Sequence, residues 1–374
     1  MGAKKIGVLT GGGDCPGLNA VIRAVAKTCL NGGCEVVGFH DGYAGLVEDR
    51  FENITDASVS GILARGGTIL GTSNVANPLA YTLPPYGAPS APADMTARVK
   101  EVAKKHRLDA LVAIGGDGTL TVGLELFRRG LPVVGVPKTI DNDLACTDVT
   151  FGFDSALAVA ADAVDKVHTT AESHHRVIVV ETMGRYAGWI ALRAGIAGGG
   201  DVILIPEIPF SHEAVCAAIQ ERKARGKKFS IVVAAEGAVN LKGERVVAKI
   251  VDGSPEPVRL GGIGYRICEA VEKGCGIESR VVVLGHLQRG GIPTAHDRWL
   301  ATRFGAHAAH LALDGKYGMM ASLQGRNITE VSIESAVKQL RRVDPEGEEV
   351  RVARSLGTAF GDPASISTKA GVCS

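Results

Sequence analysis

The sequence has little of several features that would each point to a specialised class of protein. Its formal net charge is only +1, so it lacks the basic excess that general nucleic-acid or membrane-surface binders carry. No apolar run approaches the ~20 residues of a membrane span, and the first one, residues 6–10, is too short for a secretion signal. We therefore expect a cytoplasmic protein that binds neither nucleic acid nor membranes.

The cysteines do not indicate a structural framework. None of the eight forms a C-x-x-C pair, and a chain of 374 residues is too large to need disulfides for stability. We predict reduced cysteines, with neither disulfides nor a cysteine-bound metal. Glycine, in contrast, is abundant at 49 residues with no collagen-like period, which indicates many tight turns and close approaches of the backbone to a ligand.

Short apolar runs alternate with helical patterns, which predicts an α/β fold with mostly parallel sheets. The expected strands are rich in Val, Ile and Leu without polar alternation, and they span 6–10, 34–39, 110–114, 133–136, 177–181, 202–205, 231–235 and 280–284. Helices are expected at 18–31, 94–106, 120–129, 155–170, 212–225 and 262–273. The stretch 81–92 holds four prolines and predicts a surface loop, and the polar tail from residue 344 predicts partial disorder.

Two glycine-rich turns follow expected strands. The first, Gly-Gly-Gly-Asp-Cys-Pro-Gly at 11–17, can bind an anion through backbone N–H groups and the start of a helix. It matches neither a Walker A loop nor the G-x-G-x-x-G fingerprint. The second, Gly-Gly-Asp-Gly-Thr at 115–119, places Asp117 at the carboxyl end of a strand, where open α/β sheets bind ligands. Asp117 or Thr119 could instead cap the next helix.

A third turn, Pro-Lys-Thr-Ile-Asp-Asn-Asp at 137–143, carries two carboxylates. Asp141 and Asp143 are two residues apart, so in extended backbone they face the same way. One of two such carboxylates can accept a proton while the other holds a metal or orients the base, although an Asx-rich turn is the structural alternative. A phosphate-cradling glycine turn with carboxylates that can hold Mg²⁺ and accept a proton is typical of phosphoryl transfer.

Together with Met-Gly-Arg at 183–185 and Gly-His-Leu-Gln-Arg-Gly-Gly at 285–291, these turns resemble the phosphofructokinase family over residues 4–330. The resemblance implies two Rossmann-like three-layer domains with the active site in the cleft between them. The donor domain, for ATP and Mg²⁺, would be 1–152 plus 289–338, and the sugar-phosphate domain 153–288 plus 339–374. The implied reaction transfers a phosphoryl group from ATP to the 1-hydroxyl of fructose 6-phosphate, giving fructose 1,6-bisphosphate in glycolysis.

The resemblance also implies roles for individual residues. Asp141 would be the base, Asp117 would carry Mg²⁺ with help from Asp143, and the phosphoryl group would be stabilised by Thr139, Arg185, Lys138 and the Gly13 backbone. The other donor contacts would be Gly116, Gly118, Thr119 and Asn74. The sugar would be held by Asp143, Met183, Gly184, Arg185 and Glu236, and its 6-phosphate by Arg176, Arg280, His286 and Arg289. Guanidinium forks grip phosphate bidentately.

In the family, two of these arginines, here Arg176 and Arg280, reach in from a neighbouring subunit. The resemblance therefore implies a homo-oligomer, either a tetramer or a dimer.

The phosphoryl donor depends on Gly118 and Lys138. Gly118 leaves room for the α-phosphate of a nucleotide, whereas an aspartate there would intrude and repel it. Lys138 is more typical of pyrophosphate-dependent members, but a lysine can swing away, so Gly118 favours ATP. Asn74 stands where many members have an arginine, and Lys138 is expected to compensate for it from the opposite side.

Several other activities stay open at this point. One is a pyrophosphate-dependent phosphofructokinase, and another is a kinase of a different phosphosugar, such as sedoheptulose 7-phosphate. A kinase of NAD or of a lipid would explain only the turn at 115–119. A non-catalytic subunit would be expected to have lost its base or metal residue, whereas Asp117, Asp141 and Asp143 are all present.

Overall fold

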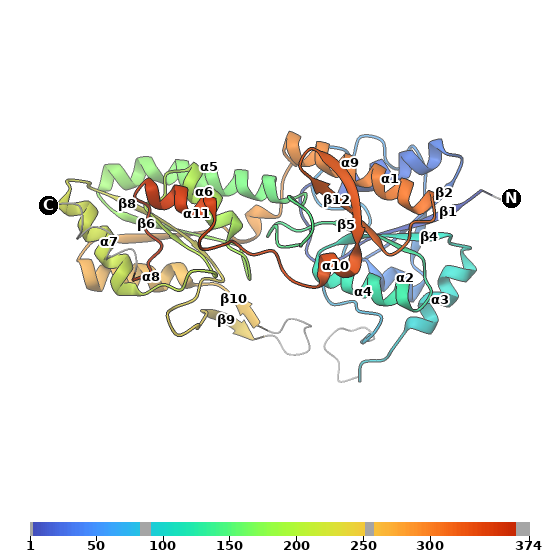
Figure 1. The fold of residues 1–374 in the computed structure, drawn as a ribbon, viewed down its shortest axis with the longest axis horizontal. Helices are drawn as coiled ribbons and strands as arrows, with labels where there is room; N and C mark the ends of the chain where they lie inside the picture. Colours follow the sequence, from blue (N-terminus) through green and yellow to red (C-terminus); the bar gives the residue numbers. More distant parts are fainter. Residues whose placement is uncertain (1–2, 83–90, 251–257, 364–374) are drawn as a thin grey trace. The chain divides into compact units, whose positions relative to one another are not determined.

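The computed structural model describes residues 3–82, 91–250 and 258–363. The described residues divide into two compact units, which we call the first unit (residues 3–82, 91–155 and 289–340) and the second unit (156–250, 258–288 and 341–363). In each unit helices cover both faces of a sheet (Figure 1). Each unit is therefore a three-layer α/β structure.

The first unit is built on a seven-stranded sheet of order β13-β12-β5-β4-β1-β2-β3. Its inner strands run parallel, and both edge strands, β3 and β13, run antiparallel to their neighbours. The strands are β1 (Lys5–Thr10), β2 (Glu35–Phe39), β3 (Phe51–Ile54), β4 (Ala110–Gly115), β5 (Val133–Pro137), β12 (Met319–Gln324) and β13 (Asn327–Ser332).

Helices cover this sheet on both sides (Figure 1). One face carries α1 (Leu18–Asn31) and α9 (Ala295–Leu313), and the other carries α2 (Tyr43–Glu48), α3 (Thr96–Lys105), α4 (Asp117–Arg128) and α10 (Ile333–Val337). Every residue of β4 is buried, which explains why its sequence is apolar without alternation. Leu9, Leu111 and Leu120 belong to the core between the sheet and α2, α3 and α4.

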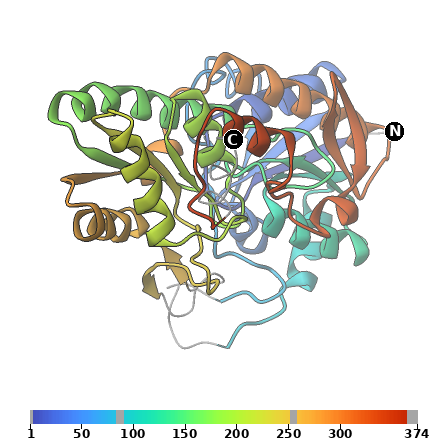
Figure 2. The ribbon, with the colours of Figure 1, turned by 60° about the vertical axis from the view of Figure 1, so that its left-hand side comes forward.

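The second unit has a four-stranded parallel sheet of order β11-β6-β8-β7. The strands are β6 (Val177–Thr182), β7 (Val202–Leu204), β8 (Ser230–Ala235) and β11 (Ser279–Val283). Figure 2 shows the helices around this sheet, which are α5 (Phe153–His174), α6 (Trp189–Ala197), α7 (His212–Ala224), α8 (Ile263–Cys275) and α11 (Glu348–Ser355). Two further strands, β9 (Val247–Ile250) and β10 (Val258–Leu260), pair antiparallel in a separate two-stranded sheet. A short 3-10 helix, η1, spans Gly285–Gln288.

All of the predicted strands and helices are present, and the mostly parallel α/β fold is confirmed. The main shifts are that α4 begins three residues before the predicted position, at Asp117, and that α5 extends to His174. Part of the tail is folded, because α11 buries Val350 and Ala353. Residues 364–374 of the tail and 83–90 of the proline-rich stretch lie outside the described residues.

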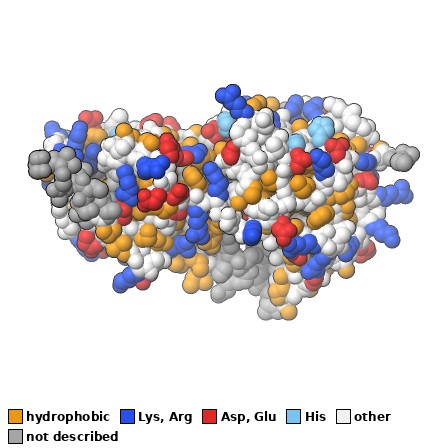
Figure 3. All heavy atoms as spheres, in the orientation of Figure 1, with side chains coloured by type: hydrophobic (Ala, Val, Ile, Leu, Met, Phe, Trp, Pro, Cys, Tyr) orange, Lys and Arg blue, Asp and Glu red, His pale blue; other side chains and the backbone are white. Residues whose placement is uncertain are grey.

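Basic and acidic side chains are interspersed on the face that Figure 3 presents. Positive and negative charges are thus mixed on this face, in keeping with the near-zero net charge of the sequence. Within the described ranges, no helix has both the length and the apolar character needed to cross a bilayer.

Candidate functional site

The three predicted turns lie side by side at one edge of the sheet of the first unit. They follow β1, β4 and β5, which are neighbours and run parallel, with Thr10 opposite Ile114 and Gly115 opposite Pro137. Backbone hydrogen bonds continue into the turns, from Gly11 N to the Ile114 oxygen (2.9 Å) and from Lys138 N to the Gly115 oxygen (3.0 Å). The carboxyl ends of the three strands therefore bring the turns together, as expected for a ligand site in an α/β sheet.

Thr119 explains why two of the turn positions are glycine. A Cβ atom at Gly11 would lie 2.6 Å from Thr119 Oγ1, and one at Gly115 would lie 2.3 Å from Thr119 Cβ. Thr119 is buried, and its carbonyl oxygen accepts a hydrogen bond from the Tyr43 hydroxyl at 2.8 Å. These two glycines allow α4 to begin close against the first two turns.

Asp117 is exposed and is the first residue of α4, whose N-cap is Gly116. Among the described residues, no side chain accepts a hydrogen bond from the backbone N–H groups as a cap at the start of α4. The alternative in which Asp117 or Thr119 caps the helix is therefore wrong. The Asp117 carboxylate is left available for a ligand at the turn.

The third turn is bent rather than extended. Asn142, between the two aspartates, has a φ of 51°, in the left-handed region, so the expectation that Asp141 and Asp143 face the same way in extended backbone is wrong. The buried Asn142 side chain holds this bend, because its Oδ1 accepts a hydrogen bond from Thr150 N at 3.0 Å. Thr139 Oγ1 donates to Asp143 Oδ1 at 3.0 Å.

The three carboxyl groups act on one another electrostatically. Burial raises the pKa of Asp143 to about 7, and the negative charges of Asp141 and Asp117 add to this shift. An acidic cluster of this kind favours binding of a cation.

Oxygen donors of this kind suit Mg²⁺, although the cluster does not enclose a metal by itself. Among the described residues, no group of three or more His, Cys, Asp or Glu side chains is arranged to hold a metal ion. This fits the usual behaviour of Mg²⁺, which is bound through one or two carboxylates and completes its shell with water and substrate phosphates. The residues present therefore fit a metal that arrives with the phosphoryl donor.

Two cations lie against the first turn. Lys138 is 4% exposed and donates from Nζ to the Gly13 oxygen at 2.5 Å, while burial, with help from the charge of Arg289, lowers its pKa. Arg289 Nη1 donates to the Asp14 oxygen at 3.0 Å, and a Cβ atom at Gly13 would lie 2.7 Å from that nitrogen. The turn thus combines backbone N–H groups with two positive charges, as phosphate binding requires. The role of Arg289 toward the sugar 6-phosphate stays a prediction.

The segment carrying Asn74 borders the same turn. Thr72 Oγ1 donates to the Gly12 oxygen at 2.7 Å, and Gly12 N donates to the Ser73 oxygen at 3.0 Å. Asn74 itself is exposed. Asn74 and Lys138 thus belong to segments that touch the same glycine turn, but the exchange of roles between them stays a prediction.

In the second unit, most of the predicted acceptor residues lie at the carboxyl edge of the sheet. Met183, Gly184 and Arg185 follow β6, Glu236 follows β8 and His286 follows β11. Glu236 N donates to the Thr182 oxygen (2.8 Å), and Gly237 N donates to the Gly184 oxygen (3.1 Å). The structure therefore brings the loops of adjacent strands β6 and β8 into contact.

Arg176 and Arg280 lie at the opposite edge of this sheet. Arg176 precedes β6, Arg280 is the second residue of β11, and both bind Glu278, with 2.7 Å between Arg176 Nε and Glu278 Oε2. The six residues of β6 separate the two edges by roughly 17 Å at ~3.3 Å per residue. Within one chain these arginines therefore do not form a cluster with His286.

Two residues that hold loops of the site in place, Glu207 and Ser73, were not identified from the sequence. Glu207 follows β7 at the carboxyl edge of the second sheet, and its only signal was an acidic residue just after an expected strand. The backbone oxygen of Ser73 accepts a hydrogen bond from Gly12 N, and a contact of this kind cannot be recognised from residue types.

A cationic glycine turn beside a carboxyl cluster, at the carboxyl edge of a parallel sheet, is typical of a phosphotransferase. Comparison with known proteins identifies the family. The phosphofructokinase family model matches residues 5–312. The chain belongs to the phosphofructokinase family.

Three relatives cover nearly the full chain. ATP-dependent 6-phosphofructokinase 2 of Clostridium perfringens is 50% identical over 364 residues, or 96% of this chain and 99% of the relative. ATP-dependent 6-phosphofructokinase of Chloroflexus aurantiacus is 52% identical, over 97% and 99%. Pyrophosphate–fructose 6-phosphate 1-phosphotransferase of Streptomyces coelicolor is 49% identical, over 91% and 96%. Relatives of similar identity thus carry names with different donors.

Solved structures show the same fold. Phosphofructokinase from Saccharomyces cerevisiae aligns with a TM-score of 0.75 and 32% identity, over 90% of this chain and 45% of that chain. The Pichia pastoris enzyme aligns with a TM-score of 0.79 and 30% identity, over 96% and 37%. This chain therefore spans less than half the length of the fungal chains.

Proposed function

We propose that this chain is an ATP-dependent 6-phosphofructokinase, which transfers the γ-phosphoryl group of ATP to the 1-hydroxyl of fructose 6-phosphate. The observation that carries the proposal is the meeting of three turns at one sheet edge, with the mutually repelling carboxyls of Asp117, Asp141 and Asp143 beside the cationic glycine turn. The names of the relatives that are about 50% identical support it. A glycolytic enzyme of this kind would work in the cytoplasm.

The residues divide the work of phosphoryl transfer between charge and proton chemistry. Asp141 accepts the proton of the sugar 1-hydroxyl while that oxygen bonds to the γ-phosphorus of ATP. The bond from this phosphorus to the bridging oxygen breaks, and ADP leaves. Asp117 and Asp143 would hold Mg²⁺, which would supply positive charge to offset that of the phosphates and would favour the ionised form of Asp143. Lys138 and the backbone N–H of Gly13 stabilise the transferring group, with Thr139 holding Asp143 in place.

The preference for ATP rests on the space at Gly118. Gly118 is exposed, and apart from its chain neighbours and the backbone of α4 a Cβ atom there would find no heavy atom of the described residues within 4 Å. The amine of Lys138 is held against Gly13, so it leaves this space open. An α-phosphate and nucleoside therefore have room at the second turn.

Pyrophosphate is the second candidate donor. It is favoured by Lys138 and by the name of the Streptomyces coelicolor relative. The two candidates share the acceptor and the product, so only the donor separates them.

The acceptor is tested by supplying Mg²⁺, ATP and fructose 6-phosphate to the purified protein and cleaving the product with aldolase. Phosphorylation at the 1-hydroxyl gives fructose 1,6-bisphosphate, which aldolase cleaves to two triose phosphates. A product that aldolase leaves intact would contradict the proposal. Transfer to sedoheptulose 7-phosphate at a higher kcat/KM would reassign the acceptor.

The proposal includes a homo-oligomer in which Arg176 and Arg280 bind the 6-phosphate in a neighbouring subunit. Its support is their position at the amino end of β6 and β11, across the sheet from Met183 and Glu236. Mixing subunits of Asp141→Asn with subunits of the double variant Arg176→Ala, Arg280→Ala tests this sharing. In mixed oligomers one kind of site regains both an intact base and intact arginines, so activity should return above that of either variant alone. If the mixture is as inactive as its components, the arginines do not serve a neighbouring site.

A further inference from the structure

Glu207 lies at the edge of the second sheet where the predicted acceptor residues lie. It follows β7, the neighbour of β8, and the ends of β8 and β6 carry Glu236 and Met183. Glu207 is half-buried, and burial raises its pKa. A carboxylate in this place needs an explanation, because none of the roles assigned above uses it.

The carboxylate of Glu207 is occupied by backbone donors. Its Oε1 accepts hydrogen bonds from Gly188 N (3.0 Å) and Val343 N (2.9 Å), and its Oε2 also lies 3.1 Å from Gly188 N. Gly188 is the N-cap of α6, and Val343 comes from the carboxyl-terminal part of the chain. Glu207 therefore joins two segments that are far apart in sequence, rather than presenting free oxygens to a ligand.

A second set of contacts fixes the same helix start. Trp189 Nε1 donates to the Arg341 oxygen at 3.1 Å, and the Arg341 guanidinium lies 4.4 Å from the centre of the Trp189 ring. We call residues 341–343 the strap. The strap lies beyond residue 312, where the match to the family model ends.

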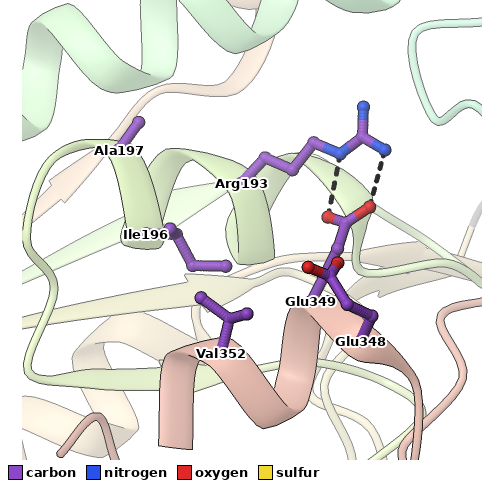
Figure 4. Close-up of a pocket in the computed structure, with 6 residues that line it drawn as sticks. All are labelled: Arg193, Ile196, Ala197, Glu348, Glu349 and Val352. Carbon is purple, nitrogen blue, oxygen red and sulfur yellow. Dashed lines mark hydrogen bonds and ion pairs between the residues drawn. The ribbon is translucent and has the colours of Figure 1, made fainter. Parts of the chain in front are cut away.

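One turn further along α6, Arg193 forms a two-pronged ion pair with Glu349 of α11, at 2.8 and 3.0 Å (Figure 4). These two side chains, with Val352, line a pocket between α6 and α11. The carboxyl-terminal segment thus holds α6 both at its start and along its side.

The loop that carries Met183, Gly184 and Arg185 ends at Gly188. It is tightly folded, since Gly184 has a φ of 135° and a Cβ atom there would lie 2.9 Å from the Ala187 oxygen. A loop this short and tight transmits a displacement of Gly188 to Met183 and Arg185.

We propose that Glu207 is a positioning residue: by binding Gly188 and the strap together, it sets the place of the Met183–Gly184–Arg185 loop and so the affinity for the sugar phosphate. The choice of fructose 6-phosphate as the ligand rests on the proposed function. The anchoring of Gly188 by Glu207 does not.

The kinetic test compares Glu207→Ala with the control Glu349→Ala. Glu207→Ala leaves the N–H groups of Gly188 and Val343 without their acceptor, so KM for fructose 6-phosphate should rise about tenfold or more, while KM for ATP stays within about twofold. Glu349→Ala breaks the α6–α11 ion pair without touching Gly188 and should leave both constants within about twofold. Glu207→Gln keeps an oxygen at the Oε1 position for both donors and should restore most of the affinity.

A structural readout that needs no activity uses the two tryptophans of the chain, Trp189 and Trp299. In a Trp299→Phe background, Glu207→Ala should red-shift the Trp189 emission and increase its quenching by acrylamide, because the strap releases the ring. Glu349→Ala should change the emission less.

The outcomes separate the inference from the proposed function. A red shift without a change in KM for fructose 6-phosphate, or no red shift at all, overturns the positioning role. If the wild type does not phosphorylate fructose 6-phosphate, the proposed function fails, and the Trp189 emission still decides whether Glu207 anchors the strap. If Glu207→Ala does not fold, Glu207→Asp replaces it, since its shorter carboxylate cannot reach both donors; an unchanged KM then also overturns the role.

Discussion

Replacing Gly118 by aspartate is the sharpest test of how the site selects its donor. Gly118 is exposed in the first turn of α4. Apart from its chain neighbours and the backbone of α4, no heavy atom of the described residues lies within 4 Å of a Cβ placed there. An acidic residue at the start of a helix is favourable to the helix dipole, so the fold should tolerate the change. The free energy of unfolding should shift by less than about 1 kcal/mol, as for most surface substitutions.

The effect on ATP should be large, because the new carboxylate lies where the α-phosphate is expected. Two like charges about 4 Å apart repel by about 4 kcal/mol at an effective dielectric constant near 20, which corresponds to roughly a thousandfold loss in rate. Mg²⁺ bound to the phosphates offsets part of this repulsion. We therefore expect kcat/KM for ATP to fall at least about 30-fold, or about 2 kcal/mol.

The assay is steady-state phosphorylation of fructose 6-phosphate at varied ATP, with Gly118→Asn as the control. Asparagine has nearly the same bulk as aspartate but no charge, so it should lose much less ATP activity. Pyrophosphate has no α-phosphate to repel, so any activity with it should be spared. If Gly118→Asp keeps more than about a third of the wild-type kcat/KM for ATP, the α-phosphate does not lie beside Gly118.

Two further predictions concern the aspartates of the third turn. Asp141→Asn should lower kcat about 10²–10⁴-fold with little change in KM, because it removes the base but keeps the shape; a variant that keeps most of its turnover would show that Asp141 is only a turn residue. Asp143 has a folded-state pKa of about 7 against an unfolded value near 3.8, so the folded protein holds a proton that the unfolded chain releases. In EDTA, the melting temperature of Asp143→Asn relative to that of the wild type should therefore rise as pH rises from about 4 to about 7, because only the wild type loses stability through this carboxyl. Equal slopes for the two proteins would refute the assignment.

The sequence predicted the inner part of the fold well, because strands buried on both faces must be apolar throughout. β4 and β5 show this most clearly, since every residue of both strands is buried. The helix α9 was missed because its few large buried residues are separated by Ala and Gly, and because Arg and His interrupt the apolar pattern. A usable signal was present in Thr294, which accepts a hydrogen bond from Asp297 N at 3.2 Å and so marks the helix start.

The site was predictable where it depends on strand order and not where it depends on backbone torsion or distant contacts. Turns that follow neighbouring parallel strands must share an edge, so the meeting of Asp117 with Asp143 could be expected. The left-handed Asn142 between the aspartates could not be read from the residue types, and neither could the contact of Arg289 with Asp14, which joins positions 275 residues apart.

Glu207 shows the same limit. Its partners are backbone N–H groups of Gly188 and Val343, which every sequence supplies and no pattern distinguishes.

The most direct measurement of the central claim is the rate of phosphorylation of fructose 6-phosphate by the wild-type protein with ATP and with pyrophosphate, side by side. Both donors give fructose 1,6-bisphosphate, so a single aldolase-coupled assay at equal Mg²⁺ reports both reactions. The open space at Gly118 predicts that ATP is used with a kcat/KM at least about 100-fold above that for pyrophosphate. Faster turnover with pyrophosphate would contradict the account and would make Lys138, with Asn74 beside the same turn, the residue that reports the donor.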